Sequence, residues 1–165
     1  MADADTTQPD ITQLCRVEHC IPVLSGETKQ EIISELIETL VASGAITEAQ
    51  APELFGEILA REEEATTGIG KGIAMPHARR SEVVEQTLLA VGLHPDGIDF
   101  DATDGAPVHV VFLIAAADPQ EYLPVAARIA QIARDDVEMK ALQRQTTPKR
   151  IHTFLAESWS SCGAS

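Results

Sequence analysis

The segment at positions 67–77 reads TGIGKGIAMPH and sets the fold of the middle of the chain. Glycine occupies every second position from Gly68 to Gly72, with an isoleucine and a lysine between the glycines. This period of two with repeated glycine indicates a turn that enters a β-strand rather than a helix. A proline follows Met75 and restricts it to extended geometry. The segment therefore predicts a short strand that ends at His77, on a backbone with few alternatives.

Two amphipathic helices are predicted on the N-terminal side of this segment. Positions 28–31 and 47–50 are capping-box sequences, and apolar residues follow each of them at helical spacing. Gly44 ends the first helix, and the second is expected to run close to Glu64. The apolar stretch at 20–24 precedes both helices and predicts a first strand.

Two strongly apolar stretches lie on the C-terminal side. Residues 87–93 and 108–115 have the length and the β-branched content of buried strands. Between them, Asp-Gly pairs at 96–97 and 104–105 predict tight turns around a short segment at 98–100.

Three helices are predicted for the last third of the chain. The first begins near Pro119 and is apolar nearly all round, so we expect it to be well buried. The second covers 137–143, and the third has Thr147 as its N-cap with a proline at the first helical position. Helices and strands alternate irregularly, which predicts an α/β fold: a single domain with a mixed β-sheet sandwiched between helices in three layers, α/β/α.

The length of 165 residues suits one domain with a sizeable core. Positions 1–10 are small, polar and acidic, and predict a flexible arm. The folded domain is expected at 11–157, followed by a flexible tail at 158–165 in which Trp159 alone is docked.

The formal net charge is -14, from 26 acidic and 12 basic side chains. Such a surface repels a nucleic-acid backbone and an anionic membrane face, so neither is expected as a partner. A basic protein partner fits better, because complementary charge speeds encounter. The apolar runs are too short to cross a bilayer, and a cytoplasmic protein is expected.

Several kinds of site are excluded. The glycines match neither the GxxxxGK[ST] pattern of a P-loop nor the GxGxxG pattern of a dinucleotide site. No metal or other cofactor is predicted, because Cys15, Cys20 and Cys162 lack a zinc spacing and no HExxH sequence occurs. These cysteines are predicted to be ordinary reduced thiols.

One of the five histidines stands out as a candidate functional residue. His77 follows glycine-rich backbone and a proline, whereas the settings of the others favour structural roles: His19, His94, His109 and His152. An unperturbed imidazole has a pKa of about 6.5, so the neutral ring is a good nucleophile near pH 7. A hydrogen bond to one ring nitrogen leaves the other free to attack phosphorus. Donors for the resulting phosphate lie nearby in the sequence, as backbone N–H groups and as Thr66, Thr67, Lys71, Arg79 and Arg80.

Positions 61–79, REEEATTGIGKGIAMPHAR, resemble the signature of the enzyme IIA domains of the phosphoenolpyruvate-dependent sugar phosphotransferase system, in its fructose, mannitol and nitrogen-regulatory (type 2) family. The family pattern is an arginine–glutamate pair, a Thr-Gly-Ile-Gly-x-Gly-Ile-Ala-x-Pro-His block, and a small residue before a basic one. The resemblance extends over positions 20–157, and it implies a phosphocarrier activity.

By this resemblance, His77 matches the phosphoacceptor, which is charged by the histidine-containing phosphocarrier HPr. Arg61 matches an arginine that steadies the phosphoryl group, although a charge favourable to a helix end is the alternative. Thr67 and Gly68 match residues that line the phosphate pocket. Tyr122 stands where the family often has a second histidine. Its neutral hydroxyl can still donate to a phosphate, and a packed aromatic residue is the alternative.

Three hypotheses follow from these residues and from the resemblance. In the first, His77 accepts a phosphoryl group from phospho-HPr and passes it to an enzyme IIB domain in sugar uptake. In the second, the phosphorylation state of His77 controls binding to regulatory protein partners, as in nitrogen-regulatory relatives. In the third, the chain is a relative that has lost phosphotransfer, for which Tyr122 is the only sign.

Overall fold

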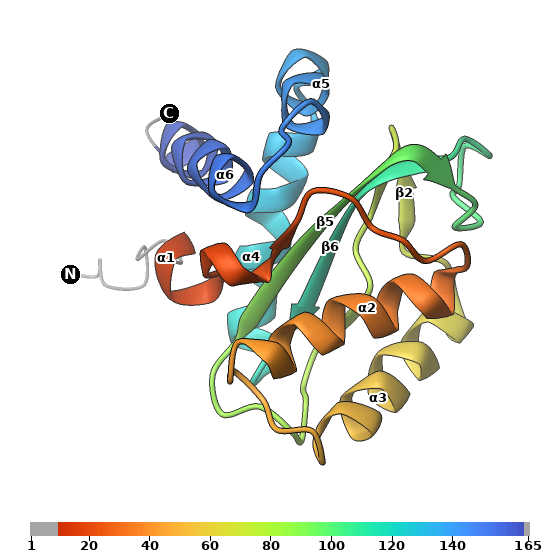
Figure 1. Ribbon diagram of the computed structural model, residues 1–165, viewed down its shortest axis with the longest axis vertical. Helices are drawn as coiled ribbons and strands as arrows, with labels where there is room; N and C mark the ends of the chain where they lie inside the picture. The colour runs from red at the N-terminus through yellow and green to blue at the C-terminus, as the bar shows by residue number, and fades with distance from the viewer. Residues whose placement is uncertain (1–9, 164–165) are drawn as a thin grey trace.

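The structure, a computed structural model, describes residues 10–163 of the chain (Figure 1). In chain order its elements are α1 (Ile11–Leu14), the 3₁₀ helix η2 (Val17–His19), β1 (Cys20–Ile21), α2 (Lys29–Ala42), α3 (Ala51–Glu64), β2 (Gly68–Gly70), β3 (Ile73–Ala74), β4 (His77–Ala78), β5 (Leu88–Ile98), β6 (Val108–Ala115), α4 (Pro119–Ala133), α5 (Asp136–Gln143) and α6 (Pro148–Gly163). In this part of the chain, no helix combines the length and the apolar character needed to cross a membrane.

The sheet is mixed, with strand order β1-β5-β6-β3-β2. The two long strands β5 and β6 run antiparallel at its centre, and β1 lies parallel to β5. On the other side of β6, β3 and then β4 pair with it in parallel, so that His77 lies opposite Ile114. β2 is antiparallel to β3. This register places His77 beside the C-terminal end of β6, where the chain turns into α4.

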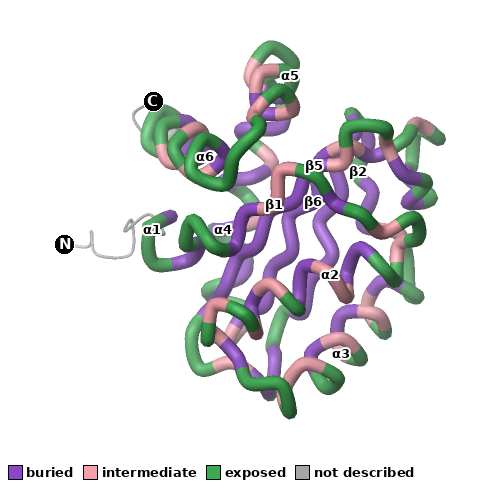
Figure 2. The backbone as a smooth tube through the Cα atoms, in the orientation of Figure 1, coloured by how far each residue is buried: buried purple, intermediate pink, exposed green. Residues whose placement is uncertain are grey.

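Helices cover both faces of the sheet (Figure 1). Apolar residues of α2 and α3 form one core cluster with one face, and those of α1, α4, α5 and α6 form a second cluster with the other. Because side chains alternate along a strand, β6 supplies both clusters. All residues of β6 except the half-buried His109 are buried, and Figure 2 shows most of the strand in the colour of buried residues. The predicted three-layer α/β/α domain is confirmed.

The predicted bounds of α2 and the predicted end of α3 near Glu64 are confirmed, whereas α3 begins at Ala51, three residues later than the capping box at 47–50 predicts. The side chain of Thr28 accepts a hydrogen bond from the Glu31 amide at 3.1 Å at the start of α2. Ahead of α3, the Gln50 amide donates to Thr47 Oγ1 at 3.2 Å, and the Thr47 amide donates to Gln50 Oε1 at 2.8 Å. Gly44 has a φ of 82°, which suits the residue that closes α2.

The prediction of a tight turn at 96–97 is wrong. β5 continues through these positions to Ile98, with a shift of register between Leu93 and Ile98. Pro95 has no N–H to give to the sheet, and Gly97 has a φ of 83°, so both fit an irregular stretch of strand better than a regular one. Asp96 and Gly97 therefore bend β5 rather than end it.

The expected tail at 158–165 is corrected as well, because α6 continues to Gly163. Trp159 follows Ile151 and Leu155 on the apolar face of this helix, and its side chain is buried. The Trp159 carbonyl accepts a hydrogen bond from the Arg128 guanidinium of α4. Packing along one helical face extends the helix beyond the expected boundary. Of the expected N-terminal arm, only Asp10 lies within the described residues, and its side chain caps α1.

The helix α4 is less buried than expected. Val125, Ile129 and Ile132 face the core, whereas the side chain of Leu123 is 57% exposed. An apolar residue stays exposed on a side of a helix that no other element covers, and Leu123 lies on such a side.

Candidate functional site

The backbone on both sides of His77 is held by β6. The amide of Ile114 donates to the Pro76 carbonyl at 3.0 Å, and the amide of Ala116 donates to the Ala78 carbonyl at 3.0 Å. His77 is thus fixed at the end of parallel strands, a common location for functional residues in α/β proteins.

The imidazole of His77 has a defined tautomer. Its Nδ1 lies 2.9 Å from the carbonyl oxygen of Met75. A carbonyl oxygen can only accept, so Nδ1 carries the proton and Nε2 keeps its lone pair. The residue is only 4% exposed. The ring therefore offers one nucleophilic nitrogen in one orientation.

The surroundings of His77 keep the ring uncharged. Burial lowers its pKa, and the positive charges of Arg61 and Arg79 lower it further. The hydrogen bond to Met75 and the negative charge of Glu62 act in the opposite direction but do not outweigh burial. With a pKa below the ordinary value near 6.5, the imidazole is neutral at pH 7.

Tyr122 of α4 lies directly against His77. The two ring centroids are 4.6 Å apart and the ring planes differ by 28°, which is a stacked arrangement. Burial raises the pKa of the Tyr122 hydroxyl, so the phenol keeps its proton at neutral pH and can act as a donor. The guanidinium of Arg79 lies 5.5 Å from the centre of the Tyr122 ring. Tyr122 is therefore both a packed aromatic residue and a direct neighbour of His77.

Arg61 approaches the same place from the last turn of α3. Its Nη1 donates to the Ala65 carbonyl at 2.9 Å, which is the helix-end contact expected of a basic residue there. Its charge also lowers the pKa values of both His77 and Tyr122. Arg61 and Arg79 thus provide positive charge around an imidazole that has none.

Thr67 and Gly68 are engaged in other contacts. Thr67 donates to Glu62 twice, from its amide at 2.9 Å and from its hydroxyl at 2.6 Å. The Gly68 amide donates to Thr66 Oγ1 at 3.0 Å, and a Cβ on Gly68 would lie 2.8 Å from Ala102 Cα. That these two residues line a phosphate pocket stays a prediction.

Two of the other candidate donors point elsewhere. The Thr66 hydroxyl donates to the Phe100 carbonyl at 2.7 Å. The Lys71 ammonium lies 3.6 Å from a carboxylate oxygen of Asp136, on α5. Of the basic residues near position 77, only Arg79 has a contact with the site.

Glu62 was not identified as a site residue from the sequence. It is 4% exposed and follows Leu54 and Ile58 at intervals of four on the buried face of α3. A carboxylate on an apolar helical face is the signal that could have found it. Within residues 10–163, no three His, Cys, Asp or Glu side chains converge as a metal ion would require.

Known proteins resemble this chain over most of its length. The family model described as phosphoenolpyruvate-dependent sugar phosphotransferase system, EIIA 2, matches residues 13–158. The fructose-specific EIIABC component of Bacillus subtilis is 32% identical over 82% of this chain, which spans only 21% of that relative. A nitrogen regulatory protein of Pseudomonas aeruginosa is 40% identical, over 80% of this chain and 85% of that protein. The crystal structure of Escherichia coli mannitol IIA matches with a TM-score of 0.72 and 26% identity, over 84% of this chain and 96% of that one.

The family match includes every residue of the site. It begins before the first strand and ends near the close of α6, so it covers His77, Arg61 and Tyr122 together. The chain belongs to the EIIA type 2 family of the phosphoenolpyruvate-dependent sugar phosphotransferase system, a family of phosphotransferase phosphocarriers.

Proposed function

We propose that the protein accepts a phosphoryl group from phospho-HPr on Nε2 of His77 and passes it to an enzyme IIB domain in sugar uptake. The observation that carries this proposal is the tautomer of His77, with the Nδ1 proton on the Met75 carbonyl and the Nε2 lone pair unused. The relay of which this transfer is a step takes place in the cytoplasm, and the proposal locates the protein there.

The transfer exchanges one nitrogen–phosphorus bond for another. Nε2 of His77 attacks phosphorus, and the bond from phosphorus to the donor's histidine breaks with its electron pair staying on that donor nitrogen. The Nδ1 proton remains on His77, so the ring gains positive charge as the new bond forms. The Met75 carbonyl, which already accepts a hydrogen bond from Nδ1, stabilises that charge.

Two cations and a phenol meet the incoming phosphoryl oxygens. Arg61 and Arg79 supply positive charge, and the protonated hydroxyl of Tyr122 supplies a donor. A hydrogen bond to a charged group contributes about 1.5–3 kcal/mol, so two or three hold the group without trapping it. Thr67 and Gly68 shape the backbone that enters the site, and Thr67 does so through Glu62.

A regulatory function is the second candidate. The identity to the Pseudomonas aeruginosa nitrogen regulatory protein is 40%, against 32% to the fructose component of Bacillus subtilis. In this function the same chemistry occurs at His77. The added charge of about -1.5 to -2 then changes which regulatory protein binds the surface around it.

Labelling tests the shared step of both candidates. Phosphoenolpyruvate, enzyme I and HPr should give the protein an acid-labile phosphate, and His77→Gln should abolish it. His152→Gln, a matched change on α6, should label like the wild type. A His77→Gln variant that is still labelled at the wild-type level would overturn the proposal.

Addition of an acceptor separates the two candidates. Loss of the label from the phosphorylated protein when a fructose-type IIB domain is added supports the transport function. Retention of the label under conditions in which a fructose IIA control is fully discharged contradicts that function and favours the regulatory one.

A further inference from the structure

A buried carboxylate, that of Glu62, is connected to His77 through Thr67 and Met75. The Glu62 side chain is on α3, outside the strands of the sheet, and it is almost completely enclosed. A buried carboxylate is costly unless it is paired and hydrogen-bonded, and Glu62 is both. Its two oxygens accept from the amide and the hydroxyl of Thr67, and Lys29 Nζ lies 3.1 Å from Oε2.

These contacts continue from Glu62 to His77 as a chain of hydrogen bonds. Glu62 holds Thr67 at two points. The Thr67 carbonyl accepts from the Met75 amide at 3.0 Å, and the Met75 carbonyl accepts from His77 Nδ1 at 2.9 Å. Each bond fixes the residue that makes the next one. The carboxylate of α3 is thus linked through Thr67 and Met75 to the imidazole, in addition to the pairing with β6 that holds the same backbone.

Lys29 holds the carboxylate from the other side. It comes from the first turn of α2, and its ammonium also lies 3.3 Å from Asp101 and 5.1 Å from the centre of the Phe100 ring. The carboxylate is thus anchored to α2 and to the segment before β6 as well as to Thr67, so it cannot shift without breaking several contacts.

We propose that Glu62 is a positioning residue for phosphoryl transfer, which holds the Met75 carbonyl against Nδ1 and offsets positive charge on the His77 ring. The kinetic part of this inference rests on the proposed function. The charged and titratable groups that act on His77 are Arg61, Arg79 and Glu62, with Tyr122 stacked on the ring. Glu62 is the one carboxylate in this set.

The charge of Glu62 matters most while the bond to phosphorus forms. At that moment the ring becomes positive, and both arginines disfavour this charge. Glu62 favours it, as its effect on the unphosphorylated ring shows, where it raises the pKa of His77. Removal of the carboxylate should therefore lower the pKa of His77 and weaken acceptance of the phosphoryl group.

Glu62→Gln and Glu63→Gln form a matched pair for the test. They make the same change at adjacent positions of α3, but Glu63 is exposed. Labelling by phospho-HPr should slow about tenfold or more in Glu62→Gln, because a displacement of 1 Å at a reacting group costs on the order of 100-fold. An NMR titration of the His77 ring should show a lower midpoint. Both quantities should be unchanged in Glu63→Gln.

Thr67 provides a second test that keeps the carboxylate in place. Thr67→Val has nearly the same shape but lacks the hydroxyl donor to Glu62 Oε1, whereas Thr67→Ser keeps that donor. Labelling should slow in the valine variant and recover in the serine variant. This pair also decides the question if Glu62→Gln does not fold.

The outcomes of the two proposals are distinct. A wild-type protein that is never labelled overturns the proposed function, while the NMR titration still reports on Glu62. A labelled wild type with unchanged rate and unchanged His77 titration in Glu62→Gln overturns the positioning role alone. Equal labelling of Thr67→Val and Thr67→Ser, with Glu62→Gln unfolded, overturns it as well.

Discussion

The hydrogen bond from His77 to Met75 joins residues only two positions apart. Pro76 lies between them, fixes its own φ and keeps Met75 extended. These three residues provide the local part of the orientation, and the pairing with β6 and the hydrogen bond from the Met75 amide to Thr67 hold them in place. Burial of this segment, rather than any added base, keeps the ring neutral.

The pH dependence of phosphorylation follows from the lowered pKa of His77. A protonated imidazole has no lone pair for phosphorus, so acceptance should be constant from pH 8 to pH 7 and should fall only below the ordinary midpoint near 6.5. An NMR titration that follows the ring protons of His77 gives that midpoint directly. The phosphoryl donor, which has titratable groups of its own, is absent from this measurement. A midpoint at or above 6.5 would show that burial does not lower the pKa of His77.

Arginine variants should distinguish the effect of a positive charge at the site from the effect of a positive charge elsewhere on the surface. Arg61→Ala should slow phosphoryl transfer about 10- to 100-fold, the equivalent of a lost charge-assisted hydrogen bond of about 1.5–3 kcal/mol. Arg80→Ala removes the same charge from an exposed position next to Arg79 and should transfer at the wild-type rate. Single-turnover rates measure both variants, and circular dichroism checks the fold. Equal rates for the two variants would show that Arg61 only caps the C-terminal end of α3.

The sequence predicted His77 because everything that singles it out lies next to it in the chain. Tyr122 was predicted only through the family resemblance, since its contact depends on β4 pairing with β6 and on the start of α4. Glu62 was missed although its spacing on α3 was visible, because it is one of three consecutive glutamates at a helix end, and such residues are usually solvated. Contacts between distant elements carry the part of the site that local patterns could not supply.

At the scale of elements, the hairpin of β2 and β3 ties α3 to the site. Its approach to the segment around Ala102 is close enough that position 68 has no room for a side chain. The Thr103 amide donates to the Gly68 carbonyl at 3.0 Å, which holds the two segments together. Gly68 therefore serves packing here as well as the entry to the strand.

Gly68→Ala and Gly56→Ala test this packing. The first places a Cβ 2.8 Å from the Ala102 backbone and should lower the free energy of unfolding by about 1–3 kcal/mol. The second adds a Cβ in the interior of α3 with nothing within 4 Å, and should raise that free energy by roughly 0.5–1 kcal/mol. Denaturant midpoints measure both. A Gly68→Ala variant as stable as the wild type would show that the Ala102 segment moves away freely.

The elements that the sequence predicted well are those with local signals. The capping residue Thr28 fixed the start of α2, and the alternating glycines indicated the turn that leads into β3. The errors arose where tertiary contacts override such signals. Asp96 and Gly97 resemble a turn, but pairing with β6 resumes at Ile98 and keeps the strand intact. Ser158 and Trp159 resemble a tail, but the core beside α4 keeps them helical.

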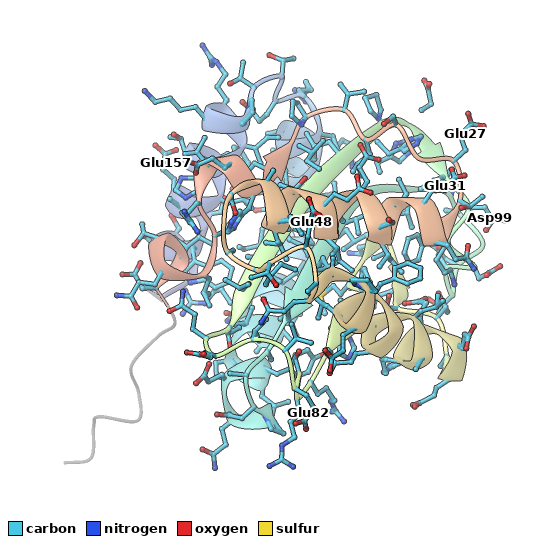
Figure 3. All side chains as sticks on the ribbon, turned by 60° about the horizontal axis from the view of Figure 1, so that its bottom comes forward. Glu27, Glu31, Glu48, Glu82, Asp99 and Glu157 are labelled. Atoms are coloured by element: carbon cyan, nitrogen blue, oxygen red, sulfur yellow. The ribbon has the colours of Figure 1, made fainter. Side chains whose placement is uncertain are left out.

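At the scale of the molecule, the negative charge is spread over both helical layers. Figure 3 shows exposed carboxylates at the start of α2 and on the nearby 98–107 segment (Glu27, Glu31, Asp99), as well as Glu48, Glu82 and Glu157 elsewhere. With a net charge of -14, the surface favours a basic partner, while Arg61 and Arg79 place positive charge locally around His77. Long-range attraction and local binding thus use charges of opposite sign.

This arrangement predicts a rate that depends on salt. At donor concentrations far below saturation, raising sodium chloride from 50 to 500 mM should slow labelling by a basic HPr severalfold, because screening shortens the reach of the field. At saturating donor the rate should change little, since encounter is then not limiting. A labelling rate independent of salt at low donor concentration would show that the acidic surface has no part in association.

The outer strands of the sheet are very short: β1 has two residues and β2 has three. Edge strands this short offer few unpaired main-chain groups to which an extended peptide could add as a further strand. A protein that docks at either edge of the sheet is therefore expected to bind through side-chain contacts rather than by strand addition. The same feature protects an otherwise strongly apolar central hairpin from self-association into fibrils.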